Sequence, residues 1–232
     1  MTEGHPPGER RAGPEGRPAP AWLRRLADEA PAMRVDRGLR PPPDGGRRSA
    51  VLILFGETER GPDLLFIQRA ATLRNHAGQP AFPGGAIDLA DGDPDGEGPV
   101  WAARREAAEE TGLDPSGVDV LTTLPDLYVW RSGFRVTPVL AWWRAPSEVA
   151  PGDPAEVASV ARVPVHDLAD PANRATVHHP SGYTGPAFLV ADMLVWGFTG
   201  GIVEALLDLG GWSRPWDHTR MVDLPGPYGR SA

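Results

Sequence analysis

Three glutamates share one face of a predicted helix near the middle of this chain. They belong to the run REAAEETGL, residues 105–113. On an α-helix, Glu106, Glu109 and Glu110 stand at i, i+3 and i+4, inside an arc of about 100°. At roughly 6 Å and an effective dielectric of about 20, each pair of these charges repels by on the order of 3 kcal/mol. Among the neighbouring residues, Arg105 alone is placed to relieve that repulsion, four positions before Glu109.

A crowded acidic face of this kind has two interpretations. It can be a solvated helix surface, which is the usual outcome for an isolated Glu-x-x-Glu-Glu pattern. It can also be a site for a hard cation, because Mg²⁺ and Mn²⁺ prefer carboxylate oxygens and bind phosphates through the same metal. The surrounding residues favour the second interpretation.

The run resembles the end of the Nudix box, R-E-U-x-E-E-x-G-U, where U is aliphatic. Ala107 occupies the aliphatic slot, Leu113 closes the motif, and Gly84-Gly85 stands upstream of it. The resemblance to the Nudix superfamily implies an α/β (α+β) fold, an α/β/α sandwich with a mixed β-sheet between helices. It also implies hydrolysis of a nucleoside diphosphate linked to another moiety, with Mg²⁺ or Mn²⁺ as cofactor. The implied metal ligands are Glu106, Glu109, Glu110 and the carbonyl of Gly85.

A second resemblance lies upstream of the box, in residues 64–85. This segment is similar to the L-L-T-x-R-S-x-x-L-R-x-H-x-G-x-V-x-F-P-G-G signature of the coenzyme A pyrophosphatase branch of Nudix hydrolases. Gln68, Ala70 and Pro80 depart from it, and residues 194–199 resemble the late W-G-x-T segment of that branch. The resemblance implies cleavage of coenzyme A or its derivatives to 3′,5′-ADP and 4′-phosphopantetheine. The matching positions are Leu64, Leu65, Arg69, Leu73, Arg74, His76, Gly78 and Phe82 to Gly85.

Four residues of this segment are candidates for substrate binding. Arg69 and Arg74 can pair with phosphates in a bidentate manner, or they can form structural salt bridges. His76 can contact the substrate or cap its own loop. Gln79 can meet a phosphate or hydrogen-bond the loop backbone.

The chain departs from the Nudix box in one respect. The box has a Glu six residues after its Gly and then seven residues before Arg-Glu, whereas here Asp91 is six residues after Gly85 and Arg105 follows later. The acidic stretch at 91–99 is therefore an insertion. Any of four acids can supply the missing carboxylate: Asp88, Asp91, Asp93 or Glu97.

The resemblance also implies catalytic roles. We expect Arg105 to orient a carboxylate of the box. The general base is a box glutamate, such as Glu106 or Glu109, or a downstream acid such as Glu156.

Two other functions compete with this hypothesis. Pro125 and Tyr128 lie near the positions where Nudix branches that hydrolyse ADP-ribose and diadenosine polyphosphates carry marker residues, so the substrate can be another nucleoside diphosphate derivative. The chain can also be a non-catalytic Nudix-fold nucleotide-binding module. The three crowded carboxylates argue against the module, because a pure binder has no need of them.

Composition excludes several other chemistries. The 232 residues contain no Cys, and all 23 basic residues are Arg, which excludes thiol nucleophiles, P-loop lysines and Schiff bases. The net charge is −8, and an acidic body does not indicate a nucleic-acid partner. No apolar stretch is long enough to span a membrane. We expect a cytoplasmic protein with a small coenzyme A-like substrate, no nucleic-acid or membrane partner, and an oligomeric state that the sequence leaves open.

The pattern of residues predicts four regions. Residues 1–20 are expected to be a disordered tail, 21–48 a short helix and a linker of solvated arginines, 49–210 the Nudix domain, and 211–232 a loose tail. Alternating and continuous apolar runs predict strands, and the acidic run and residues 195–209 predict helices. The predicted strands cover 50–55, 63–68, 118–130, 134–143, 156–163, 174–179 and 187–190.

Overall fold

The computed structural model describes residues 16–33, 39–43, 45–73, 75–130, 132–180, 182–225 and 228. Within these residues the largest element is a mixed sheet of eight strands. Its order is β3-β2-β1-β7-β5, with β4 paired to β1, β6 to β7 and β8 to β2. β1 and β7 run parallel, and the other pairs are antiparallel. The strands are β1 (Arg47–Thr58), β2 (Gly61–Arg69), β3 (Pro80–Ala81), β4 (Gly84–Ala86), β5 (Val118–Thr123), β6 (Leu127–Val129), β7 (Phe134–Trp143) and β8 (Val157–Pro164).

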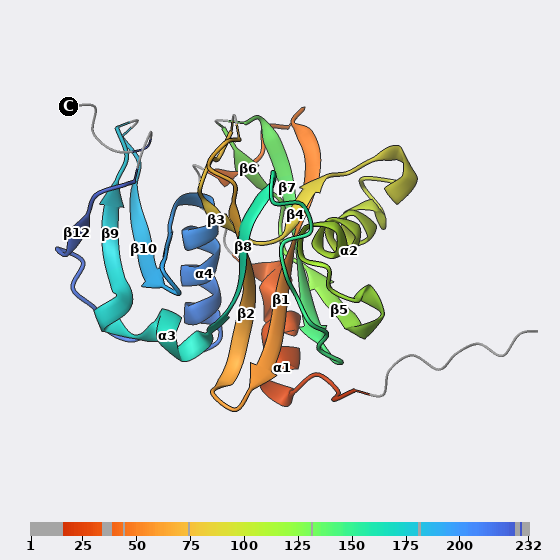
Figure 1. Cartoon of the computed structure of the whole chain (residues 1–232), viewed down its shortest axis with the longest axis horizontal. Coiled ribbons are helices and arrows are strands. Elements are labelled where there is room, and N and C mark those ends of the chain that lie inside the picture. Colours follow the sequence, from red (N-terminus) through yellow and green to blue (C-terminus); the bar gives the residue numbers. More distant parts are fainter. Residues whose placement is uncertain are drawn as a thin grey trace, which may run out of the picture.

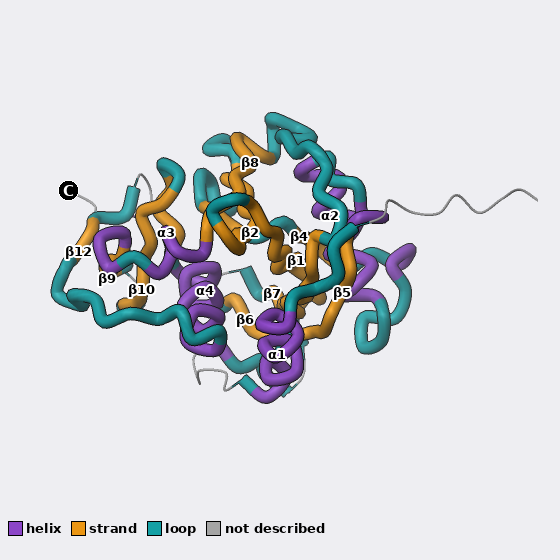
Figure 2. Tube along the Cα trace, turned by 90° about the horizontal axis from the view of Figure 1, so that it is seen from below, coloured by secondary structure: helices purple, strands orange, loops and turns teal. Residues whose placement is uncertain are grey.

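Helices cover both faces of this sheet (Figure 1). Alternate residues of β1 divide between the faces, since Leu52 and Leu54 pack with α2 whereas Ile53 and Phe55 pack with α1 and α4. Figure 2 shows α1 and α4 on the same side of the sheet, opposite α2. The predicted α/β/α sandwich with a mixed sheet between helices is therefore confirmed. The helices are α1 (Ala21–Glu29), α2 (Gly98–Thr111), α3 (Val165–Ala169) and α4 (Gly197–Leu209), with 3₁₀ turns η1 (Ala30–Ala32), η3 (Leu89–Asp91), η4 (Pro115–Gly117) and η5 (Pro171–Asn173).

A smaller sheet extends the side of α1 and α4. It has the order β11-β10-β9-β12, from β9 (Arg174–His178), β10 (Thr184–Val190), β11 (Met193–Val195) and β12 (Met221–Val222). Phe188 and Val195 of this sheet belong to the same buried cluster as Ile53 of β1 and Leu206 of α4. The smaller sheet and the main sheet thus share one hydrophobic core.

The predicted strands are present, with changes at their ends. The strand expected over 118–130 is two strands, β5 and β6, separated at Leu124, Pro125 and Asp126. Pro125 has no backbone N–H to donate to β7, which explains the interruption. α4 begins at Gly197 rather than at Val195, because Met193–Val195 pair with β10. Several short elements were not predicted: β3, β4, β11, β12 and α3.

The predicted tail at 1–20 is wrong for its last residues. The backbone N–H of Arg17 donates to the carbonyl of Arg144 at 3.0 Å, and the buried indole of Trp142 donates to the carbonyl of Arg17 at 2.6 Å. Ala19 packs against the core beside α1. Residues 16–20 therefore bind to the end of β7, and residues 1–15 lie outside the described residues.

Two other boundaries also need correction. Arg47 and Arg48, assigned to a solvated linker, are the first residues of β1. Residues 211–225 are not a loose tail, because Trp212 packs edge-on against Trp22 at 5.1 Å and β12 pairs with β9. These placements depend on contacts between segments far apart in the chain, which local residue patterns do not report.

No helix among the described residues has the length and apolar character needed to cross a membrane.

We expect deletion of residues 1–20 to lower the melting temperature by several degrees. The deletion leaves the buried N–H of Trp142 without its acceptor, at a cost of about 1–3 kcal/mol, and each kcal/mol corresponds to about 2–4 °C for a domain of this size. Differential scanning calorimetry measures the change. Deletion of residues 1–15 is the matched control, because it keeps the bonds of Arg17 to Arg144 and Trp142 and the packing of Ala19. An unchanged melting temperature after deletion of 1–20 contradicts the docked segment.

Candidate active site

The three box glutamates lie on α2, which packs against the sheet through small side chains. Its side chains toward the sheet are Ala102, Ala103 and Ala107, all fully buried against β1 and β7. The helix ends at Gly112, which adopts a left-handed conformation with φ 68° and donates to the carbonyl of Ala108. This is a left-handed C-cap, and glycine adopts it without steric penalty.

Arg105 is the centre of the polar network around α2. Its Nε and Nη2 donate to the two carboxylate oxygens of Asp91 at 3.0 and 2.8 Å. Nη2 also donates to the carbonyl of Ala86 at 3.1 Å. On the other side, Nη1 donates to Glu106 at 2.9 Å and to Glu109 at 3.3 Å. Arg105 therefore orients two box carboxylates while its own direction is set by Asp91.

The structure selects Asp91 from the four acids that the sequence left open. Besides the two bonds from Arg105, Asp91 accepts the backbone N–H of Asp88 at 2.8 Å. These donors, Arg105 first, hold the pKa of the buried Asp91 below its usual range. Asp88 reaches Arg105 only at 3.7 Å with an exposed side chain.

Gly84 and Gly85 bring backbone against the acidic face. The N–H of Gly84 donates to Oε2 of Glu110 at 2.9 Å. A Cβ on Gly85 would collide with the carboxylate of Glu106. A side chain at position 85 would therefore force the carboxylate of Glu106 to move.

Glu110 is the most deeply buried of the three glutamates. Burial raises its pKa to about 7, with further contributions from the charges of Glu106 and Glu156. The N–H of Gly84 and the guanidinium of Arg69, 3.7 Å away, act in the opposite direction. Burial likewise raises the pKa of Glu106. These carboxylates are desolvated more than their neighbours compensate.

The loop that follows β2 lies against Glu110. Arg69, the last residue of β2, pairs with Glu110, so the structural salt bridge considered for it is present. The N–H of Ala70 donates to the carbonyl of Glu156 at 2.8 Å, which places the start of β8 beside this loop. The loop thus connects the two acids Glu110 and Glu156.

His76 and Gln79 bind each other in this loop. Nδ1 of His76 and Oε1 of Gln79 are 2.8 Å apart. His76 has a positive φ of 55°, which is uncommon for a residue with a side chain and marks a locally strained turn. Their substrate contacts remain predictions, and Arg74 lies outside the described residues.

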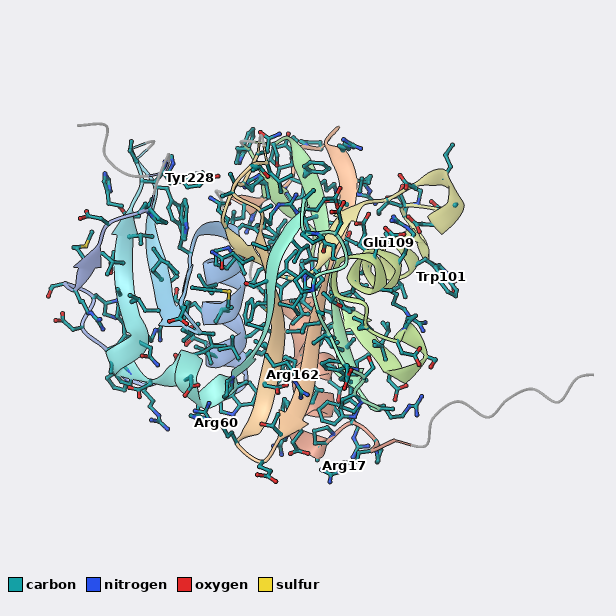
Figure 3. All side chains as sticks on the ribbon, in the orientation of Figure 1. Arg17, Arg60, Trp101, Glu109, Arg162 and Tyr228 are labelled. Atoms are coloured by element: carbon teal, nitrogen blue, oxygen red, sulfur yellow. The ribbon has the colours of Figure 1, made fainter. Side chains whose placement is uncertain are left out.

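Figure 3 shows the exposed Glu109 at the end of α2 near β4, whereas Trp101 projects from α2 away from the sheet. The side chain of Glu109 is 60% exposed, that of Glu106 is 19% exposed and that of Glu110 is 6% exposed. The acidic face thus runs from solvent into the protein.

The donor set suits a hard cation in its chemistry. Within the described ranges, no group of three His, Cys, Asp or Glu side chains is arranged to hold a metal ion. The contacts explain this, because Arg105 draws Glu106 and Glu109 toward itself while Glu110 bonds to Gly84. The raised pKa values of Glu106 and Glu110 nevertheless show that their ionised forms lack enough positive charge nearby. A divalent cation supplies that charge. Glu106, Glu109, Glu110 and the Gly85 carbonyl are the groups that can hold it.

Comparison with known proteins gives an independent view of this chain. The NUDIX domain family matches residues 46–182. The chain is 36% identical to the uncharacterized Nudix hydrolase NudL of Citrobacter koseri, over 72% of this chain and 87% of that protein. It is 38% identical to the protein of the same name from Cronobacter sakazakii, over 69% of this chain and 81% of that protein. Among solved structures, a NUDIX hydrolase from Alicyclobacillus acidocaldarius matches with a TM-score of 0.46 and 18% identity, over 72% of this chain and 93% of that chain.

We expect the buried Glu110 to make the metal-free protein less stable as the pH rises. The pKa of Glu110 is higher in the folded protein, about 7, than in the unfolded chain. The stabilisation from its protonated form is therefore complete below about pH 4.5 and is lost as the pH rises through about 7. Between about pH 5 and pH 8, the free energy of unfolding should therefore fall more in the wild type than in Glu110→Gln. The difference should reach about 3 kcal/mol, because one pKa unit corresponds to about 1.4 kcal/mol.

Urea unfolding in EDTA across this pH range measures both proteins. Glu110→Gln is a suitable reference because the amide oxygen still accepts the N–H of Gly84. If both proteins show the same pH dependence of unfolding, Glu110 is not a buried, partly protonated carboxylate.

Proposed function

Because the chain belongs to the Nudix hydrolase family, we propose that it is a divalent-metal-dependent pyrophosphohydrolase that cleaves the diphosphate of coenzyme A or a coenzyme A derivative. The products are 3′,5′-ADP and 4′-phosphopantetheine or its acylated form. One observation carries the proposal. The segment with the coenzyme A-like signature, residues 64–85, contacts Glu110 of α2 at two points, through Arg69 and through Gly84.

The acidic face is proposed as the metal site, held by Glu106, Glu109, Glu110 and the carbonyl of Gly85. When bound, Mg²⁺ or Mn²⁺ neutralises charge on the diphosphate and lowers the pKa of a bound water. Arg105 keeps two of these carboxylates in place through its bonds to Glu106 and Glu109. This positioning matters because a displacement of about 1 Å at such a site costs on the order of 100-fold in rate.

Proton transfer from the attacking water is assigned to an acid at this face. The candidates are a box glutamate, such as Glu106 or Glu109, and Glu156. The charge of Glu156 lies near enough to raise the pKa of Glu110, and its side chain is exposed. A substrate diphosphate on the acidic face therefore has a further carboxylate in its vicinity.

The loop after β2 is proposed to contact the rest of the substrate. Arg69, Arg74, His76 and Gln79 are its candidate ligands. The bond between His76 and Gln79 fixes the direction of both side chains in the free protein, so less conformational entropy is lost when they meet a phosphate. Arg69, whose side chain is 29% exposed, is proposed to bind a substrate phosphate beside its ion pair with Glu110.

We expect coenzyme A to be hydrolysed with a higher kcat/KM than ADP-ribose, NADH or a diadenosine polyphosphate. The loop supplies contacts beyond those made to metal, and one charge-assisted contact contributes about 1.5–3 kcal/mol, or roughly 10–150-fold in rate when it is lost. Chromatography of the products, with Mg²⁺ and then with Mn²⁺, measures the rates. Dephospho-coenzyme A tests whether the 3′-phosphate is one of the groups recognised.

A matched variant tests the loop itself. His76→Ala should reduce kcat/KM for coenzyme A more than for ADP-ribose if the loop reads the coenzyme A half. At least tenfold more efficient hydrolysis of ADP-ribose or a diadenosine polyphosphate under both metals refutes the coenzyme A assignment and leaves the family unchanged. No turnover of any diphosphate supports a binding module instead.

We expect Glu109→Gln and Glu110→Gln to reduce turnover by orders of magnitude while the melting temperature holds or rises. Each change removes a metal-ligating charge and also relieves repulsion on α2. Steady-state kinetics at saturating Mg²⁺ and thermal unfolding measure the two effects. Glu97→Gln, in the acidic insertion, is the control for removal of a nearby negative charge. Near-wild-type rates in both variants exclude the acidic face as the metal site.

A further inference from the structure

Arg48, on β1, binds both ends of the segment that carries Asp91. At the first end, the backbone N–H of Ile87 donates to the carbonyl of Arg48 at 3.0 Å. At the second end, Nη2 of Arg48 donates to the carbonyl of Pro94 at 2.7 Å and pairs with the carboxylate of Asp95. Asp91 lies between these two points, in η3. One residue of the sheet thus closes segment 87–95 at both ends.

The guanidinium of Arg48 takes its direction from the main sheet. Its Nη1 donates to Oδ2 of Asp126 at 3.2 Å. Asp126 is fixed in turn by two residues of β7, since it accepts Nε of Arg135 at 2.7 Å and Oγ1 of Thr137 at 2.6 Å. The side chain of Arg48 is 21% exposed. Arg48 is therefore an anchored group to which the segment binds.

The acidic segment needs such an anchor for two reasons. It carries four aspartates in nine residues, at 88, 91, 93 and 95, and their mutual repulsion favours an open loop. It also presents an aspartate where the Nudix box has a glutamate, so the acid is one methylene shorter. The backbone of the segment must then lie closer to Arg105 for the two bonds to Asp91 to form.

We propose that Arg48 is a positioning residue of the metal site. It holds segment 87–95 in the arrangement in which Asp91 binds Arg105, and Arg105 then sets the carboxylates of Glu106 and Glu109 for the metal. The inference rests on the proposed function, because it needs the acidic face to bind a divalent cation. It gives the acidic insertion a role, which is to deliver the partner of Arg105.

Binding of Mn²⁺ alone, without any substrate, tests this role. The rise in melting temperature with added Mn²⁺ gives the concentration at half-saturation. Arg48→Met removes the donors and keeps most of the side-chain stem. It should raise the half-saturating concentration about tenfold or more, the usual effect of losing a group that orients metal ligands. Arg60→Met is the control for loss of an arginine and its ion pair, because Arg60 pairs with Asp167 and, among the described residues, makes no ion pair or hydrogen bond with segment 87–95 or Asp126. The control should stay within about twofold of the wild type.

A double-mutant cycle distinguishes positioning from a general loss of structure. If Arg48 acts through Asp91, Asp91→Asn alone and Asp91→Asn with Arg48→Met should show the same half-saturating Mn²⁺ concentration. Additive effects overturn the proposal. In steady-state kinetics, Arg48→Met should lose kcat at low metal and recover it at saturating Mn²⁺, with the KM for the diphosphate unchanged.

The outcomes separate this inference from the proposed function. A wild type whose melting temperature does not respond to Mn²⁺ overturns both. A wild type that responds, with Arg48→Met indistinguishable from it, overturns the inference alone. If Arg48→Met does not fold, Arg48→Lys replaces it. That variant keeps the charge but cannot reach three acceptors at once, and should raise half-saturation by at least about threefold. If Arg48→Lys has the same half-saturating Mn²⁺ concentration as the wild type, the proposal is wrong.

Discussion

The bonds between Arg105 and Asp91 are the interaction on which the candidate site depends. Arg105 is the one cation in residues 105–113, and each of its three nitrogens is engaged. Two of them are used on Asp91, which leaves Nη1 directed at Glu106 and Glu109. An arginine suits this position because its planar fork binds one carboxylate at two points while a third nitrogen reaches others. Without Asp91, the guanidinium of Arg105 would be free to bind only the box glutamates, and its positive charge would neutralise them.

The part of the fold that follows from local patterns was predictable. β7 has the predicted bounds, because the run from Phe134 to Trp143 is apolar apart from Arg135 and Thr137 and starts just after Gly133. α2 was predictable from its alanine face and from Gly112 as its C-cap. β3, β4 and β12 were not, because each has two or three residues and exists only by pairing with a distant strand. Residues 16–20 were assigned to a tail for the same reason, since their partners belong to β7.

The candidate site likewise has residues that local patterns predict and residues that depend on contacts between distant segments. The box glutamates and Arg105 could be named from the motif, because the helix itself places them together, and Gly85 followed from the resemblance to the Nudix box. The partner of Arg105 could not be chosen among four acids, because the choice depends on how the insertion folds back on β1. Arg48 was missed, since an arginine after Gly45-Gly46 carries no sequence signal of its own. Its partners Pro94 and Asp126 are 46 and 78 positions away.

Close packing and the chemistry of the site have a common origin in α2. Ala102, Ala103 and Ala107 let the helix axis approach β1 and β7, which buries apolar surface and stabilises the fold. The same approach carries Glu110, on the neighbouring part of the helix surface, out of solvent and against Gly84. A larger residue in place of these alanines would lift Glu110 toward water and restore an ordinary pKa, but it would also separate Glu106 from the backbone of Gly85. The small side chains that let α2 pack against the sheet therefore also desolvate its carboxylates. Such a face is suited to a diphosphate bound through a divalent cation.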